Sequence, residues 1–71
     1  MRFDHHRFLV EKWDDPDRLA KFLRDYGHDV PRATVNMWFR RNSVPSDIFA
    51  LLLTLLEIET GAPVSTAEYL S

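Results

Sequence analysis

Five side chains between residues 32 and 40 are spaced so that a helix would carry them on one face. They are separated by one, three or four positions: Arg32, Ala33, Asn36, Met37 and Arg40. Side chains three and four apart are neighbours on a helix surface. Arginine can donate two hydrogen bonds to guanine, asparagine can pair with adenine, and alanine or methionine can contact the thymine methyl group. This face therefore predicts a helix that binds in the major groove of DNA, with Arg40 and Arg41 near phosphates.

The charge distribution permits such a partner although the chain is acidic, with a formal net charge of −2. Residues 1–44 carry nine basic side chains against seven acidic ones, whereas residues 45–71 carry four acidic ones and no lysine or arginine. Between Asp29 and Asp47 the only charged side chains are three arginines. Since the field of one face decides whether a surface attracts phosphates, this distribution permits double-stranded DNA as the partner of this stretch, without establishing it.

The helix that carries this face is expected to run from about Pro31 to Arg41. Proline suits the opening turn of a helix, and Asp29 lies close enough to cap it. Asn42 tolerates the left-handed conformation that often ends a helix. The residues expected to face inward are Val35, Trp38 and Phe39.

Two helices are expected before this one. The first spans about residues 5–13 and ends before Asp15-Pro16, where Asp15 can cap the second and Pro16 fits its first turn. The second helix shows an apolar stripe at helical spacing, formed by Leu19, Phe22, Leu23 and Tyr26. Gly27 is a natural stop because it adopts positive φ without a Cβ penalty.

Two further helices are expected after it. Ser46 is the predicted cap of a helix that reaches about Thr60 before Gly61, and residues 65–68 have the S-x-x-E spacing of a capping box. A final short helix would extend through Leu70. Since no strand alternation occurs, the pattern predicts one all-α domain over residues 1–71, a compact bundle of four or five short helices.

Several short motifs resemble the Cro/C1-type (lambda repressor-like) helix-turn-helix DNA-binding proteins, which include small phage and prophage regulators. The resemblance covers about residues 16–70 and rests on these positions: Leu19-Ala20, Gly27, Val30, Val35, Trp38, Asn42-Ser43-Val44-Pro45, Glu57-Ile58-Glu59-Thr60-Gly61 and Val64-Ser65. It implies a transcriptional regulator whose DNA contacts come from Arg32, Ala33, Asn36, Met37 and Arg40, and whose helix pair packs through Val35 and Trp38. The turn departs from the family pattern, because Ala20 to Gly27 is about one helical turn longer and His28 and Asp29 precede Val30.

The fourth predicted helix is more apolar than one buried stripe requires, with nine of the eleven residues from Ile48 to Ile58 apolar. We therefore predict a homodimer with some of four residues in its interface: Phe49, Leu52, Leu53 and Leu56. A twofold dimer would read a palindromic operator. The alternative is a monomer in which the first and last helices cover this helix completely.

Other function classes receive little support from the residues. There is no cysteine, which removes disulfides, thiolate zinc sites and thiol catalysis. His5 and His6 are adjacent and diverge on a helix, so we expect no metal site. No nucleophile-and-base pattern and no glycine-rich phosphate loop occurs, so we expect neither an enzyme nor a cofactor or small-molecule ligand. With no signal-like start and no apolar run long enough for a bilayer, we expect the bacterial cytoplasm or nucleoid, or the host cytoplasm of a phage.

One alternative function stays open, a protein-binding adaptor or antitoxin-like module with a helix-turn-helix fold that does not bind DNA. The acidic second half of the chain favours it, and the uniformly basic stretch over residues 30–46 disfavours it. Burial of the arginines between Arg32 and Arg41, or their neutralisation by carboxylates, would contradict the DNA-binding hypothesis.

Overall fold

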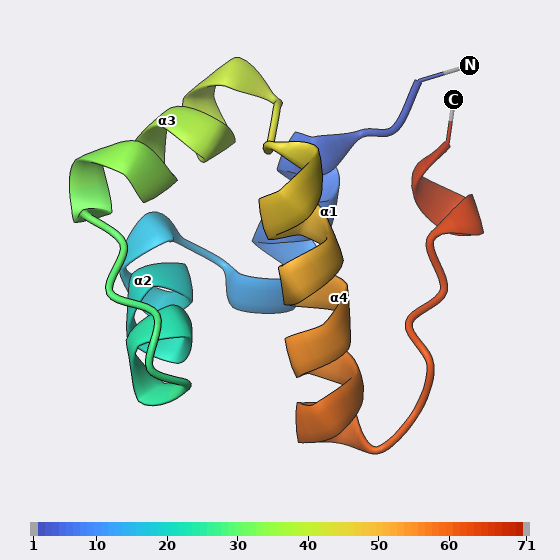
Figure 1. Ribbon diagram of the computed structural model, residues 1–71. Helices are drawn as coiled ribbons and strands as arrows, with labels where there is room; N and C mark the ends of the chain where they lie inside the picture. The colour runs from blue at the N-terminus through green and yellow to red at the C-terminus, as the bar shows by residue number, and fades with distance from the viewer. Residues whose placement is uncertain (1, 71) are drawn as a thin grey trace.

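Four α-helices and one short 3₁₀-helix make up the computed structural model, which describes residues 2–70 (Figure 1). The elements, in chain order, are α1 (His5–Trp13), α2 (Pro16–Asp25), α3 (Arg32–Arg41), α4 (Ser46–Thr60) and η1 (Ala67–Tyr69). Within residues 2–70 the only β interaction is an isolated antiparallel bridge between Phe3 and Leu70. The predicted all-α bundle is therefore confirmed.

Helix boundaries follow from capping residues close in sequence. The Asp15 side chain accepts a hydrogen bond from the Arg18 backbone N–H at 2.9 Å, and Pro16 is the first residue of α2, both as predicted. Asn42 ends α3 with a φ of 52°, and Gly61 ends α4 with a φ of 72°. Both adopt the left-handed conformation expected at these positions.

Three predicted caps are wrong. Neither Asp29 nor Ser46 caps a helix, because Pro31 and Pro45 occupy the cap positions of α3 and α4, and Ser46 is already helical. The proline carbonyls begin these helices instead: the Pro45 oxygen accepts from the Phe49 N–H at 2.8 Å. The capping box expected at residues 65–68 does not form either, since η1 has no side-chain cap and Leu70 is extended where it pairs with Phe3.

The core is one apolar cluster to which all four helices contribute. Its fully buried members are Phe8, Leu9, Leu19, Leu23, Val35, Leu52 and Tyr69. The Phe8 ring lies at the centre, with ring centroids of Trp13, Phe49 and Tyr69 at 5.8, 5.5 and 5.3 Å, all edge-on. Aromatic rings prefer this edge-to-face arrangement, so Phe8 joins α1 to α4 and to η1.

The segment after α4 returns to α1 and brings Leu70 beside Phe3 (Figure 1). The Asp4 N–H donates to the Tyr69 carbonyl at 2.8 Å, and the Arg7 guanidinium lies 5.2 Å from the centre of the Tyr69 ring. The Tyr26 hydroxyl donates to the Glu59 carboxylate, which joins the end of α2 to the end of α4. Within residues 2–70 no helix has the length and apolar character needed to cross a membrane.

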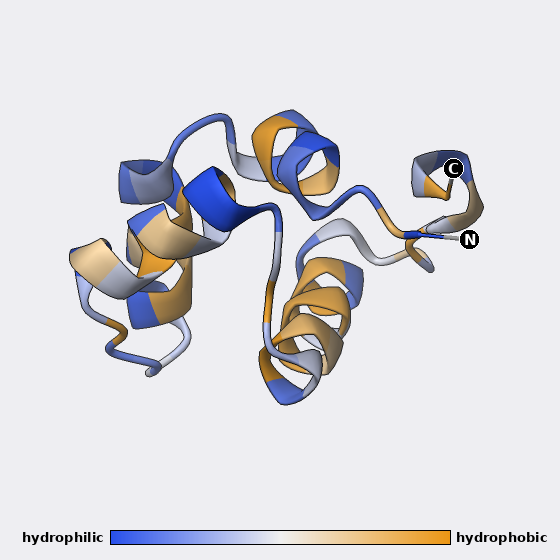
Figure 2. Ribbon diagram, turned by 90° about the horizontal axis from the view of Figure 1, so that it is seen from above, coloured by the Kyte–Doolittle hydropathy of each residue, from blue (hydrophilic) through white to orange (hydrophobic). Residues whose placement is uncertain are grey.

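Helix α4 is apolar on most of its sides (Figure 2), yet a single chain already covers much of it. Leu52 and Leu56 are 0% and 6% exposed, and the Phe49 ring lies 4.8 Å from the Phe3 ring. The aromatic residues of the N-terminal segment reach α4 and fill this side. Of the four residues of which some were expected in a dimer interface, Leu52 and Leu56 are thus core residues of one chain, whereas Phe49 and Leu53 are half-buried. Ile58 is 63% exposed, and the homodimer stays a prediction.

Burial raises the pKa of the Tyr69 phenol from 10.0 to about 12, and the Glu68 carboxylate acts in the same direction. In the unfolded chain the phenol loses its proton near pH 10, so rising pH favours unfolding. We expect this contribution to stability to be complete below pH 10 and to be lost between pH 10 and about 12. Urea unfolding followed by circular dichroism should show a weaker pH dependence in Tyr69→Phe. If the free energy of unfolding depends equally on pH in both proteins, Tyr69 is not the source of this pH dependence.

Candidate nucleic-acid interface

The exposed face of α3 carries the side chains that the sequence assigned to it. Arg32, Ala33, Met37, Arg40 and Arg41 are exposed, and Asn36 is half-buried. On the opposite face Val35, Trp38 and Phe39 are 0%, 7% and 6% exposed. The predicted division of this helix into an inner and an outer face is confirmed.

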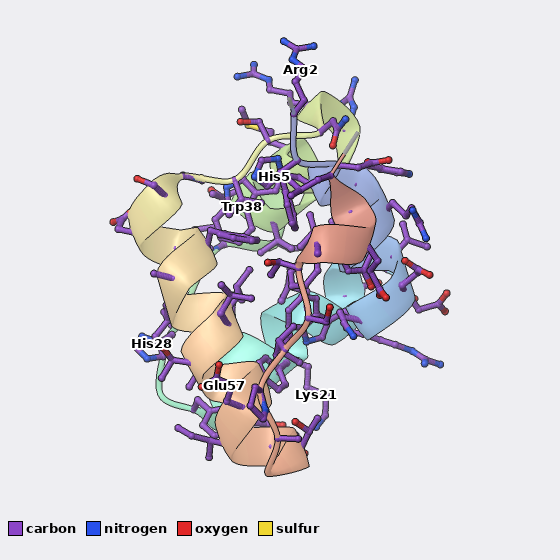
Figure 3. All side chains as sticks on the ribbon, turned by 90° about the vertical axis from the view of Figure 1, so that its right-hand side faces the viewer. Arg2, His5, Lys21, His28, Trp38 and Glu57 are labelled. Atoms are coloured by element: carbon purple, nitrogen blue, oxygen red, sulfur yellow. The ribbon has the colours of Figure 1, made fainter. Side chains whose placement is uncertain are left out.

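Helix α3 lies at the periphery of the molecule, where it crosses one end of the bundle and packs on α1 and α2 (Figure 1). Figure 3 shows Trp38 inside the molecule, whereas Arg2 extends away from it. Because Ala33, Met37 and Arg40 are exposed along α3, one long side of this helix is open to a large partner.

The C-terminal end of α3 is held by the beginning of α1. The His6 backbone N–H donates to the Asn42 side-chain oxygen at 2.6 Å, and the His6 ring Nδ1 lies 2.8 Å from the Phe39 carbonyl. Because a carbonyl only accepts, Nδ1 must carry the proton. His6 therefore positions α3, a role that the sequence did not indicate because the two partners are 33 residues apart. His5 turns the other way, with its ring 4.9 Å from that of Phe3.

One of the three arginines of α3 is neutralised. The Arg32 side chain forms an ion pair with Asp17 in the first turn of α2, with Nε bonded to Oδ1 and Nη2 lying 3.5 Å from Oδ2. This bond also raises the pKa of Arg32. The face of α3 contains no acid of its own, but its neighbour supplies one. For this residue the structure departs from the expectation of an uncompensated cationic face.

Arg40 and Arg41 differ from Arg32. Both are exposed in the last turn of α3, and no carboxylate among residues 2–70 forms an ion pair with either. Cations at this end of a helix also complement its dipole. Arg41 borders a hollow of about 290 Å³ whose wall is formed by Thr34, Met37, Trp38, Ser43 and Pro45. These two guanidiniums are free to bind an anionic oxygen, either a phosphate or a carboxylate.

The connection between α2 and α3 has its own ordered structure. The His28 N–H donates to the Leu23 carbonyl at 2.8 Å and the Gly27 N–H to the Arg24 carbonyl at 2.9 Å, with Gly27 at a φ of 86°. This pair of bonds is a Schellman motif, which closes the end of α2. The additional His28 and Asp29 are exposed, so the enlarged turn predicted from the sequence bulges into solvent.

Comparison with known proteins found no matching family model and no significant match to a curated protein or to a solved structure. Among residues 2–70 no group of three or more potential metal ligands comes together. The exposed face of α3 and the motifs in the sequence are therefore the features of this chain that bear on its function.

Proposed function

We propose that the protein is a sequence-specific double-stranded DNA-binding transcriptional regulator of the Cro type. It binds a palindromic operator as a homodimer and inserts α3 into the major groove. The observation that carries this proposal is the exposed face of α3, where Arg40 and Arg41 have no carboxylate partner among residues 2–70. The resemblance of residues 16–70 to this family supports it.

The mechanism assigns two kinds of contact to α3. Arg40 and Arg41 neutralise backbone phosphates, which supplies affinity but no sequence information. Base edges are read by the four residues nearer the start of the helix: Arg32, Ala33, Asn36 and Met37. The buried Val35 and Trp38 keep the helix rigid, so that it enters the groove as one body. The bound protein acts by occupying DNA that polymerase also needs, with no catalytic step.

A second copy of the chain would double the number of arginines available for phosphate contacts, which is small on a single chain. Two α3 helices spaced by roughly 34–36 Å contact successive major grooves of a palindrome. The exposed Ile58 and half-buried Leu53 on α4 leave apolar surface for such a contact. The mass of the DNA complex tests the two-to-one stoichiometry.

Duplex titration and selection of bound sequences from a random pool test the proposal. Random duplex should bind with an affinity that falls steeply between about 50 and 200 mM salt. Arg32→Ala and Asn36→Ala should reduce discrimination among sequences. Arg41→Ala should weaken binding about equally on all sequences and reduce the salt slope by about one unit.

Arg24→Ala on α2 is the matched control, because it removes an exposed arginine outside α3. It should leave discrimination unchanged. If the three α3 variants bind the selected operator like the parent protein, the role of α3 is wrong.

The second candidate function is the protein-binding adaptor. The neutralised Arg32 favours it, as does the 40% exposed Met37, which borders the hollow beside Trp38 and Pro45. Exposed methionine suits contact with another protein. Absence of salt-sensitive duplex binding up to high protein concentration would support the adaptor over the regulator.

A further inference from the structure

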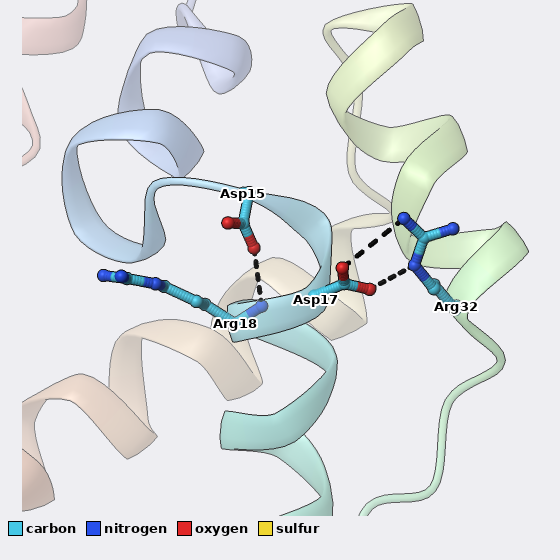
Figure 4. Close-up of polar contacts among 4 residues, drawn as sticks. All are labelled: Asp15, Asp17, Arg18 and Arg32. Atoms are coloured by element: carbon cyan, nitrogen blue, oxygen red, sulfur yellow. Dashed lines mark hydrogen bonds and ion pairs between the residues drawn. The ribbon is translucent and has the colours of Figure 1, made fainter.

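We propose that Asp17 is a specificity-determining residue of this interface. Its carboxylate orients the Arg32 guanidinium so that this group can bind an uncharged base edge, and it repels a phosphate placed next to Arg32. This inference rests on the proposed DNA-binding function. Asp17 lies on α2 and was not among the candidate contact residues. Its importance follows from the ion pair that joins the first turn of α2 to the first residue of α3 (Figure 4).

The atoms of this ion pair decide which part of Arg32 stays available. Asp17 occupies the side edge of the guanidinium, through Nε and Nη2. Nη1 forms no hydrogen bond with any residue from 2 to 70. Because a guanidinium presents five N–H groups in a planar fork, its end edge, formed by Nη1 and Nη2, still offers two parallel donors.

That end edge matches the acceptors of guanine. The O6 and N7 atoms of guanine accept two parallel hydrogen bonds from an arginine in the major groove, and the base edge carries no net charge. A phosphate is also an acceptor for arginine, but it is anionic. The Asp17 carboxylate would repel a phosphate placed next to Arg32, whereas it would not repel guanine in the same way. The ion pair with Asp17 therefore favours binding of Arg32 to a guanine edge over binding to a phosphate.

The fold gives only a small reason for the position of Asp17, because an acid in the first turn of α2 complements the dipole of that helix. Asp15 already caps α2, and the buried Leu19, Leu23 and Val35 lie in the core that holds α2 and α3 together. Both side chains of the ion pair are about two-thirds exposed, at 65% for Asp17 and 66% for Arg32. Exposed ion pairs contribute little to stability. The bond is therefore better explained by what it does to Arg32 than by what it adds to the fold.

The contrast within α3 agrees with this role. Arg40 and Arg41, at the end where phosphates are expected, have no carboxylate partner among residues 2–70, whereas Arg32, at the start, has one. A protein that needs only affinity for phosphates gains nothing from an acid beside one of its few cations. An acid at this position lowers binding to random DNA and so increases the ratio of specific to non-specific affinity.

The test compares Asp17→Asn with Asp25→Asn. Asp25 is also on α2 and pairs with Lys21 at 3.0 Å, so its replacement removes the same charge and one exposed ion pair without touching Arg32. Each variant is titrated with random duplex, with the selected operator, and with that operator carrying 7-deazaguanine, which lacks the N7 acceptor. Circular dichroism melting confirms that each variant is folded.

We expect Asp17→Asn to bind random duplex about 3- to 10-fold more tightly than the wild type, with a salt slope steeper by about one unit. Its preference for guanine over 7-deazaguanine should fall by a similar factor, and Arg32→Ala should abolish this effect of the substitution. Asp25→Asn should change the preference for guanine and the salt slope by less than Asp17→Asn does.

If Asp17→Asn behaves like Asp25→Asn, or if it binds random duplex more weakly, the inference is overturned while the regulator stands. If the wild type binds no duplex in a salt-sensitive manner, the proposed function fails, and this inference fails with it.

Discussion

Phe8→Ala is expected to lower the free energy of unfolding by about 3–5 kcal/mol. Phe8 is fully buried, and its ring contacts aromatic rings from the N-terminal segment, from α4 and from η1. Loss of the ring leaves a cavity where these elements meet. A chain of 71 residues has a total stability of only roughly 4–10 kcal/mol at typical values per residue. The variant should therefore be largely unfolded near 37 °C.

Urea unfolding followed by circular dichroism measures this effect. Val10→Ala is the matched control, because Val10 lies on the same helix and is 36% exposed. Its midpoint should shift by far less, since surface substitutions change stability by about 0.5 kcal/mol or less. An unchanged midpoint for Phe8→Ala would mean that Phe8 does not occupy the centre of the core.

Reversal of charge at the end of α3, in the double variant Arg40→Glu/Arg41→Glu, is expected to weaken duplex binding by at least about 100-fold at low salt. The substitution removes two phosphate contacts and places two carboxylates against the backbone of the DNA. The logarithmic salt slope should fall by about two units per chain. Fluorescence anisotropy of a labelled duplex, at several salt concentrations, measures both quantities.

The matched control is Arg18→Glu/Arg24→Glu, which makes the same change in net charge at two exposed positions of α2. If the charge of the whole molecule decides affinity, the two double variants should lose binding equally. If the face of α3 decides it, only the Arg40/Arg41 variant loses most of its affinity. Retention of binding by that variant, with the helices intact by circular dichroism, would contradict the proposed role of α3.

The helices themselves were largely predictable from short-range signals. Asp15-Pro16, Asn42 and Gly61 act on the backbone dihedral angles within one turn of their own position, so their effect is visible in the sequence. The inner and outer faces of α3 were predictable for the same reason, because the helical period alone places Arg40 on the side opposite Val35 and Trp38. The caps expected at Asp29 and Ser46 failed because the neighbouring prolines already supply the carbonyls that begin those helices.

The coverage of α4 was not predictable in this way. Its composition indicated more apolar surface than one buried stripe requires. Composition does not show, however, which other segment of the chain packs against that surface. The N-terminal Phe3 and Phe8 contact Phe49, and the chain after α4 brings Tyr69 back to α1. Leu52 and Leu56 are therefore core residues of one chain, a placement that the helical pattern could not distinguish from contact with a second copy.

Local chemistry thus sufficed for the class of fold, the helix limits and the residues on the open face of α3, because capping and helical period act over a few residues. The ion pair that offsets the charge of Arg32 on that face depends on a partner distant in sequence. The hydrogen bonds that hold the C-terminal end of α3 depend on another. Asp17 meets Arg32 across 15 positions and His6 meets Phe39 across 33. Such pairs form only when packed helices bring remote segments together, and nothing in the local pattern of either segment specifies the other.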